Sequence, residues 1–286
     1  MIASIPAWLL PLALCAACAP LHAQVPIPAG AEPGFSRVAR SITSLDAGWR
    51  FLRADAPGAD AAMFDDSAWS NVTLPHTFNG ADGDDGGTYY RGVGWYRRTL
   101  TIGTVPAGRR AYLQFDGAAL ATDVFVNGVP VGRHEGGYAR FRFDVTAALR
   151  AGTNVIAVKV DNSRLPQIAP LGGDFTVFGG LYRHVSLVET ADTHFDLLDA
   201  GSPGGYVTTL ALDERQASLQ AVLRLRNDGR TVSRARIEVA IRDANGTTVA
   251  AASQAVRLAP GAVATQTVPL VLMSPHLWQG LADPYL

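Results

Sequence analysis

The chain has 286 residues, of which 48% are hydrophobic and only 17% are charged. This is enough apolar material for roughly two domains with buried cores, and it excludes long disorder. The formal net charge is −1, from 24 basic and 25 acidic residues, and no basic block interrupts this balance. The composition therefore argues against a nucleic-acid partner, which would need a basic face.

The amino terminus predicts a targeting segment, with a signal peptide over residues 1–23. Residues 7–20 (AWLLPLALCAACAP) form an apolar run of the length of a signal-peptide core, although no Lys or Arg precedes it. The run is shorter than the roughly 20 apolar residues of a transmembrane helix. A buried helix, an anchor or a lipoprotein signal at Cys18 are the alternatives. Cleavage before Gln24 would remove both cysteines, Cys15 and Cys18, and export the protein to the periplasm or beyond the cell.

After a linker predicted at residues 24–40, short apolar segments alternate with turn residues, which is typical of an all-β protein. Asn127-Gly128 predicts a tight type I′ hairpin turn. Short helical turns are expected at residues 65–69 and 145–149, the second capped by Thr146. We predict a first domain over residues 41–190, with its clearest strands at 94–102, 110–115, 123–126, 139–144, 154–160 and 183–189.

A second β-domain is predicted over residues 192–286. Leu223 and Leu225 fall on one face of their strand, and Arg224 and Arg226 fall on the other, as a half-solvated sheet requires. The spacing suits an immunoglobulin-like sandwich without the usual disulfide. The sequence stops where a last strand has barely begun, so we expect this sandwich to be incomplete. The strands are expected at 206–212, 219–227, 235–242, 247–252 and 264–271.

One long loop of the first domain combines carboxylates with aromatic rings, a mixture that suits a sugar. Loops of about twenty residues inside a compact domain are usually functional, and the alternative is a polar surface loop with packed tyrosines. The acidic run also resembles part of a calcium loop, but the glutamate that should follow is missing. The residues concerned are Asp82, Asp84, Asp85, Tyr89, Tyr90 and Arg91.

Spacing alone predicts no catalytic or metal site. The histidines are scattered, and His134-Glu135 lacks the second histidine of a zinc motif because residue 138 is tyrosine. The few glutamates do not pair for acid–base work. We expect residues 134–138 and Trp95 to be framework.

Eight segments, in order between residues 45 and 188, resemble the amino-terminal part of glycoside hydrolase family 2 and, within it, bacterial β-galactosidases. The stretch from 192 to 286 resembles the second domain of that family. The resemblance implies a jelly-roll (galactose-binding-like) sugar-binding β-sandwich, an immunoglobulin-like β-sandwich and a (β/α)₈ catalytic barrel, which this chain lacks. The segments are 74–79 (LPHTFN), 94–98 (GWYRR), 115–117 (FDG), 123–128 (DVFVNG), 134–138 (HEGGY), 161–163 (DNS), 169–175 (APLGGDF) and 178–185 (FGGLYRHV).

The resemblance also implies roles for particular residues. Two barrel glutamates perform retaining hydrolysis in the family, and no residue here matches either, so this segment should be inactive alone. An aspartate of the first domain contacts the sugar and, in some members, a monovalent cation; Asp174 holds that position, with a turn-forming role as the alternative. A residue after Leu-Pro points toward the substrate. It is Thr77, where relatives carry asparagine, or Asn79 with a shifted register. Tyr182-Arg183 is expected to be a buried pair that positions the loop of Asp174.

The resemblance implies an exported β-galactosidase that acts on terminal β-galactosides, because a carboxylate at Asp174 suits a 6-hydroxyl and repels a glucuronate. It implies no cofactor beyond a monovalent or divalent cation in the full-length enzyme. The expected partners are a carbohydrate and the barrel of the same chain, with room for a homo-oligomer and without nucleic acid or a membrane span. The alternatives are a β-glucuronidase, a β-mannosidase, a stand-alone secreted carbohydrate-binding module and an adhesion module.

Overall fold

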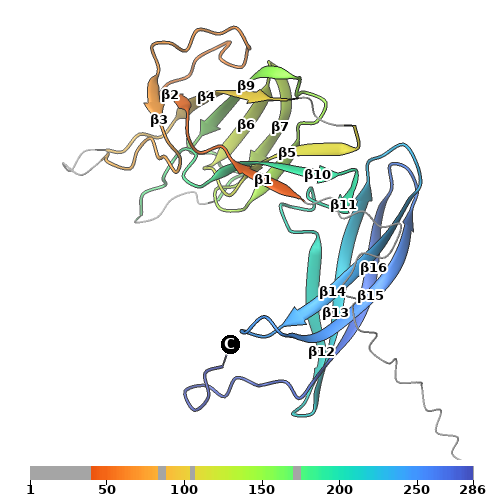
Figure 1. Ribbon diagram of the computed structural model, residues 1–286. Coiled ribbons are helices and arrows are strands. Elements are labelled where there is room, and N and C mark those ends of the chain that lie inside the picture. Colours follow the sequence, from red (N-terminus) through yellow and green to blue (C-terminus); the bar gives the residue numbers. More distant parts are fainter. Residues whose placement is uncertain (1–39, 83–87, 104–106, 170–174, 286) are drawn as a thin grey trace, which may run out of the picture.

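The computed structural model describes residues 40–82, 88–103, 107–169 and 175–285. In these residues sixteen β-strands and no helix are found, and they form two β-sandwiches (Figure 1). The described part therefore contains no helix that is long and apolar enough to cross a membrane. The all-β fold class predicted from the sequence is confirmed. The predicted signal peptide and all but the last residue of the predicted linker lie outside the described residues.

The first sandwich packs a six-stranded sheet against a four-stranded one, and every strand pairing in both is antiparallel. The six-stranded sheet has the spatial order β3 (Ser70–Val72), β2 (Trp49–Leu52), β4 (Val93–Ile102), β9 (Gly152–Asp161), β6 (Ala121–Val126) and β7 (Val129–Glu135). The four-stranded sheet has the order β1 (Ser41–Ser44), β10 (Val185–Ala191), β5 (Arg109–Phe115) and β8 (Phe141–Asp144).

The alternation of side chains along β6 separates the core from the outer face of the sheet. Val124 and Val126 are fully buried in the core between the two sheets, and burial of such a side chain contributes about 1.5–3 kcal/mol. Phe125 points the other way and stacks on Trp95, with 6.0 Å between ring centroids. Trp95 donates its indole N–H to Asp55, and the ammonium of Lys159 lies 5.8 Å from the centre of the indole ring.

In the second sandwich, β13 (Gln216–Asn227) is the central strand of the larger sheet. Its partners are β11 (Thr193–Phe195), β12 (Gly205–Leu212) and β16 (Val263–Met273), while β14 (Ser233–Arg242) and β15 (Thr248–Leu258) form a separate pair. Leu223 and Leu225 are buried in the core, whereas Arg224 and Arg226 reach carboxylates on the other face. The alternation predicted from the sequence is confirmed.

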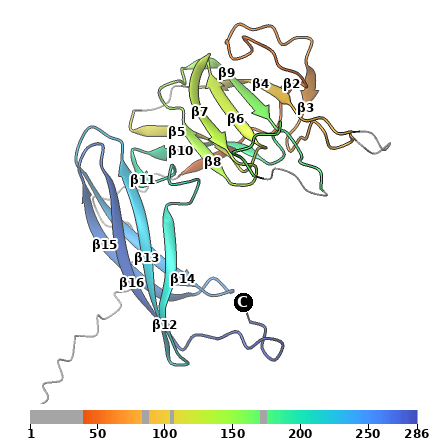
Figure 2. The ribbon, with the colours of Figure 1, turned by 180° about the vertical axis from the view of Figure 1, so that it is seen from behind.

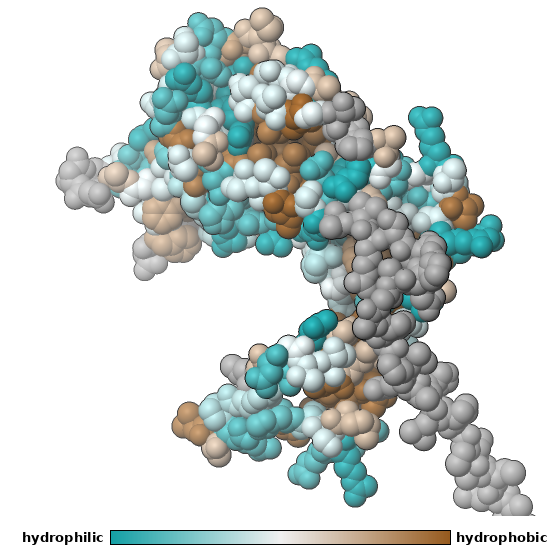
Figure 3. All heavy atoms as spheres, in the orientation of Figure 1, coloured by the Kyte–Doolittle hydropathy of each residue, from teal (hydrophilic) through white to brown (hydrophobic). Residues whose placement is uncertain are grey.

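Apolar side chains also reach the surface of both sandwiches, where they form the brown patches of Figure 3. On β12, Val207 and Leu210 are 65% and 63% exposed. Such patches are typical of surfaces that meet another protein segment.

The two sandwiches meet near β5, β10 and β11, as the view from behind shows (Figure 2). Asp192 alone separates β10 from β11. Arg142 on β8 is buried and fastens the following segment, because its Nη1 donates to the carbonyls of Leu197 (3.0 Å) and Ser202 (2.8 Å). Burial, together with the charges of Arg40 and Arg140, lowers the pKa of Arg142 to about 10.

The expected helical turns are single hydrogen-bonded turns, and the predicted cap of the second is wrong. The amide of Leu149 donates to the carbonyl of Val145, which closes one turn. Asp144 accepts the amide N–H of Thr146 at 2.9 Å. The hydroxyl of Thr146 instead accepts the amide N–H of Ala111 on β5, so this side chain joins the turn to the sheet.

Candidate functional site

The candidate site begins with Asn79, at the centre of the loop that joins β3 to β4. Its side chain is only 1% exposed. Nδ2 donates to the carbonyls of Tyr90 (3.0 Å) and Val177 (3.1 Å), and Oδ1 accepts the amide of Gly179 (2.9 Å) and the hydroxyl of Thr77 (3.0 Å). A side-chain amide has two donors and two acceptor positions. All four are therefore used inside the protein.

Asn162, the first residue after β9, fixes the same segment from a second direction. Its side chain is fully buried and donates to the carbonyl of Val177 at 3.0 Å, while its Oδ1 accepts the amide of Gly92 at 2.8 Å. The carbonyl of Val177 thus receives one N–H from each asparagine. We call Asn79 and Asn162 the asparagine clamp. The sequence alone assigns Asn162 no role, since its partners lie 15 and 70 residues away in the chain.

The clamped segment also depends on glycine. A Cβ on Gly179 would lie 2.3 Å from the ring of Phe78 and 2.6 Å from the side chain of Asn162. The backbone continues the contact, because the amides of His76 and Phe78 donate to the carbonyls of Leu181 and Gly179. Two segments about 100 residues apart in sequence are therefore joined side by side.

The structure brings two of the three predicted sugar-contacting residues to this junction. Thr77 is half-buried and its hydroxyl is engaged with Asn79. Asp174 lies outside the described residues, but Phe175, directly after it, begins the segment that the clamp holds. Contact of Asp174, Thr77 or Asn79 with a sugar stays a prediction.

A neutral polar pair lies beside this junction. Nδ1 of His76 and the hydroxyl of Tyr96 are 2.8 Å apart. The rings of Phe51 and His76 pack edge to face, with 4.7 Å between their centroids. Burial lowers the pKa of His76 and raises the pKa of Tyr96 far above its usual range. Both side chains are therefore uncharged near neutral pH, and the pair adds hydrogen bonding without charge.

The acidic loop is anchored by an ion pair. Asp82 receives both terminal nitrogens of Arg53, at 2.9 and 2.7 Å, and the amide of Tyr90 at 2.9 Å. The guanidinium of Arg53 also lies over the ring of Tyr90. The amide of Tyr90, with Arg53, lowers the pKa of Asp82. Asp84 and Asp85 lie outside the described residues, within which no three His, Cys, Asp or Glu side chains are grouped as metal ligands would be.

The prediction of a buried Tyr182-Arg183 pair is wrong for the arginine. Tyr182 is half-buried and donates its hydroxyl to the carbonyl of Gly137. Arg183 is exposed, and its Nη1 reaches the carbonyls of Asp116 and Tyr138. The arginine side chain is long enough to donate hydrogen bonds to both carbonyls while its guanidinium stays exposed to solvent.

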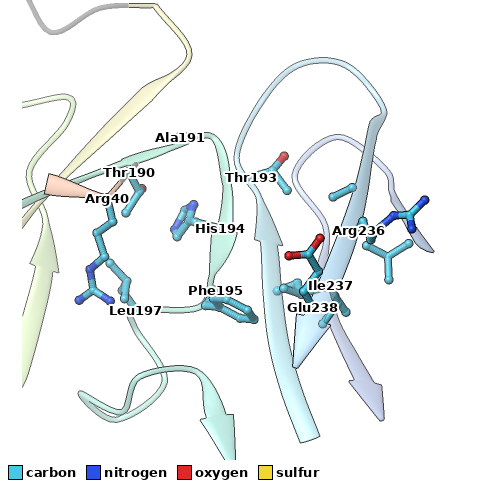
Figure 4. Close-up of a pocket in the computed structure, with 13 residues that line it drawn as sticks. Arg40, Thr190, Ala191, Thr193, His194, Phe195, Leu197, Arg236, Ile237 and Glu238 are labelled. Atoms are coloured by element: carbon cyan, nitrogen blue, oxygen red, sulfur yellow. The ribbon is translucent and has the colours of Figure 1, made fainter. Parts of the chain in front are cut away.

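A pocket of 360 Å³ lies at the junction of the sandwiches and is lined by His194 and Phe195 of β11 and by Ile237 and Glu238 of β14 (Figure 4). The Nε2 of His194 is 2.8 Å from the hydroxyl of Tyr112 and 3.9 Å from Asp228. Burial lowers the pKa of His194. This cluster couples a β5 side chain of the first sandwich to the second.

Comparison with known proteins assigns both sandwiches to one family. The sugar-binding domain model of glycosyl hydrolases family 2 matches residues 55–191, and the second model, glycosyl hydrolases family 2, matches residues 205–286. A β-glucuronidase of Bacteroides fragilis is 37% identical over 75% of this chain and 31% of its own length. The β-galactosidase BoGH2A of Bacteroides ovatus is 33% identical over 86% of this chain and 29% of its own.

Solved structures give the same result. The β-glucuronidase of Bacteroides uniformis aligns with a TM-score of 0.79 and 34% identity, over 84% of this chain and 29% of its own. A glycosyl hydrolase family 2 member from Bacteroides cellulosilyticus aligns with a TM-score of 0.72 and 29% identity, over 85% of this chain and 33% of its own. The chain thus spans about a third of the length of these relatives. By sequence and by fold, the chain belongs to glycosyl hydrolases family 2.

Proposed function

We propose that this chain is the amino-terminal, non-catalytic part of an exported family 2 glycosidase that hydrolyses terminal β-galactosides. The asparagine clamp is the observation that carries the proposal. It ties the loop of Thr77 and Asn79 to the segment that starts directly after Asp174. A rigid junction between these loops supports the idea that they meet the substrate together. The carboxylate of Asp174 favours a neutral sugar hydroxyl over a uronate.

A second candidate substrate class is the β-glucuronides. The names of the relatives favour it, since the protein at 37% identity and the structure with a TM-score of 0.79 are both called β-glucuronidases. The two candidates differ in a single carboxylate on the sugar. A direct comparison of the two substrates therefore separates them.

The test uses the complete gene product, purified from the source cell and assayed with p-nitrophenyl β-galactoside and β-glucuronide. We expect kcat/KM to be larger for the galactoside. The reverse order would support the second candidate, and hydrolysis of neither substrate would overturn both. Amino-terminal sequencing of the exported product should begin at Gln24, and an intact Met1 would overturn export by a cleaved signal.

Replacing Asp174 tests the substrate contact. Loss of a hydrogen bond to a charged group costs about 1.5–3 kcal/mol, so Asp174→Ala should lower kcat/KM of the complete enzyme by about 10–100-fold. Asp60→Ala removes a carboxylate elsewhere in the first sandwich and should leave kcat/KM unchanged. Equal kinetics for the two variants would discard the role of Asp174.

A further inference from the structure

A second concave site, formed by both sandwiches, carries an unusual concentration of arginine. The site is a groove of 670 Å³ between the chain segments at residues 107–110, 149–151 and 228–230. Four arginines line it: Arg109, Arg110 and Arg150 from the first sandwich and Arg230 from the second. We call it the arginine groove. It shares no residue with the candidate substrate site.

Both carboxylates of the groove are already paired with an arginine. Asp192 is paired with Arg110 at 2.8 Å, and Asp228 is paired with Arg226 at 3.0 Å. Among the salt bridges of the described residues, none involves Arg109, Arg150 or Arg230. Three guanidinium charges therefore remain uncompensated by a direct ion pair.

The remaining contacts of these arginines leave donors available. Nη2 of Arg109 donates to the hydroxyl of Ser41 at 3.4 Å, and that hydroxyl donates in turn to Glu189. Nε of Arg150 donates to the carbonyl of Thr153 at 3.3 Å. A guanidinium has five N–H donors in a planar fork, so most donors of both side chains stay free to bind a ligand.

This chemistry selects an oxyanion. The guanidinium fork matches the geometry of carboxylate, sulfate and phosphate groups. Several like charges around a concave surface also raise the local concentration of anions. Pockets of 300–1,000 Å³ hold small organic ligands, so the volume of the groove exceeds the needs of a lone inorganic ion.

We propose that the arginine groove binds an acidic saccharide through a carboxylate or sulfate group. The sugar-binding family model covers the three arginines of the first sandwich, which favours a saccharide as the carrier of the anion. Arg230 belongs to the other sandwich, so a ligand held by all of them spans the junction. Binding should therefore also stabilise the contact between the sandwiches.

The test is isothermal titration calorimetry on the 286-residue chain at low salt. The probes are trigalacturonate, a sulfated galactotriose, neutral galactotriose and inorganic sulfate. We expect one acidic trisaccharide to bind with one-to-one stoichiometry, and the one that binds identifies the anion as carboxylate or sulfate. Binding of neither, or equal binding of neutral galactotriose, overturns the proposal. Sulfate that binds as tightly as both trisaccharides would also overturn it, because no saccharide would then be recognised.

The variants separate a built groove from general attraction to positive charge. The double substitution Arg150→Gln and Arg230→Gln should weaken binding at least tenfold. The matched control is Arg234→Gln with Arg257→Gln, two exposed arginines that are opposite each other on β14 and β15. It removes the same charge from a flat sheet and should change binding less than twofold. Equal loss in both double variants would overturn the proposal. All four positions are on the surface, and circular dichroism checks that the fold is kept.

Discussion

At the scale of single residues, Arg97 on β4 is a buried charge that needs several hydrogen-bond partners. It is 1% exposed, pairs with Asp66 at 2.8 Å, and donates to the carbonyls of Ala59, Ala61 and Phe64. One buried guanidinium therefore organises the whole segment between β2 and β3. Its partners would lose their donors together if the charge were removed.

Replacing Arg97 with Met should destabilise the first sandwich by about 3 kcal/mol, because Asp66 and the backbone carbonyls lose the donors of a buried guanidinium. Urea unfolding followed by the fluorescence of Trp49, Trp69 and Trp95, all buried in this sandwich, measures the change. Arg133→Met is the control, since Arg133 forms only surface ion pairs and should cost less than about 1 kcal/mol. Similar losses of stability in the two variants would contradict the stabilising role of buried Arg97.

The asparagine clamp gives a second prediction at this scale. Asn79→Asp puts oxygen where an N–H now meets the carbonyls of Tyr90 and Val177, so we expect a loss of about 3 kcal/mol in the same unfolding assay. Asn71→Asp makes the same exchange at an exposed position and should stay within about 0.5 kcal/mol. An Asn79 variant as stable as the Asn71 variant would show that the asparagine clamp does not contribute to the free energy of unfolding.

The sequence marked Thr77 and Asn79 as important but could not say what they contact. The partners of Asn79 at Val177 and Gly179 lie 98 and 100 residues away, and only the folded chain brings them within hydrogen-bonding distance. The same limit applies to Asn162. A resemblance can point to a residue, whereas its donors and acceptors depend on the packing of distant segments.

At the scale of elements, the hairpin between β6 and β7 agrees with its sequence signal. Asn127 and Gly128 have φ angles of 55° and 83°, as a type I′ turn needs. A Cβ on Gly128 would lie 3.7 Å from its nearest neighbour, so space is available and only the backbone angle opposes a side chain. A substitution at Gly128 therefore measures the free-energy cost of the left-handed backbone angle alone.

Gly128→Ala should therefore destabilise the first sandwich by about 1–2 kcal/mol, the cost of a left-handed backbone for a residue with a Cβ. Gly103→Ala is the matched control, because a Cβ there would meet none of the described residues within 4 Å and the backbone angle is not left-handed. It should be neutral or slightly stabilising. Equal losses would mean that the turn angle is not the cause.

The longer strands were predictable because their apolar residues alternate with polar ones over many positions. The strand β7 was missed, since Pro130 and Gly132 interrupt its pattern. It survives because it is an edge strand, and Pro130 lies opposite Phe125 where the pairing register shifts. Sheet order was beyond the sequence as well, because neighbours such as β4 and β9 are far apart in the chain.

At the scale of the whole molecule, the junction between the sandwiches should be sensitive to acid. Burial lowers the pKa of His194 from its ordinary value of 6.5, so the unfolded chain takes up a proton there before the folded chain does. The stabilisation is complete above pH 6.5 and is lost as the pH falls through the lower folded pKa. Protonated Nε2 could no longer accept the hydroxyl of Tyr112.

His194 is surrounded by other charged groups, among them Asp228 and Arg226. Burial raises the pKa of Asp228, but the hydrogen bond from Arg226 and the nearby cations outweigh it, so the net pKa lies below 3.8. Arg110 and Asp192 complete the surroundings. The ordinary histidine pKa of 6.5 lies between pH 7.5 and 5, so the unfolded chain takes up its proton at position 194 within this range.

The measurement is the urea midpoint of wild type and His194→Gln between pH 7.5 and 5. We expect the variant to lose less stability over this range than the wild type does. The comparison also cancels His76 and His134, whose pKa values burial lowers as well. An identical slope for the wild type and His194→Gln would contradict the prediction.

The contact between Lys159 and Trp95 has a practical consequence. Lys159 is the single lysine among 24 basic residues, and guanidinium groups do not react with amine-directed esters. Within these 286 residues such a reagent would therefore find one side-chain target, and it would attach at the indole face of Trp95. Acylation would also remove the charge that pairs with Asp55. A dye coupled there, next to an indole that quenches fluorescence, would report on the outer face of the six-stranded sheet without any change to the sequence.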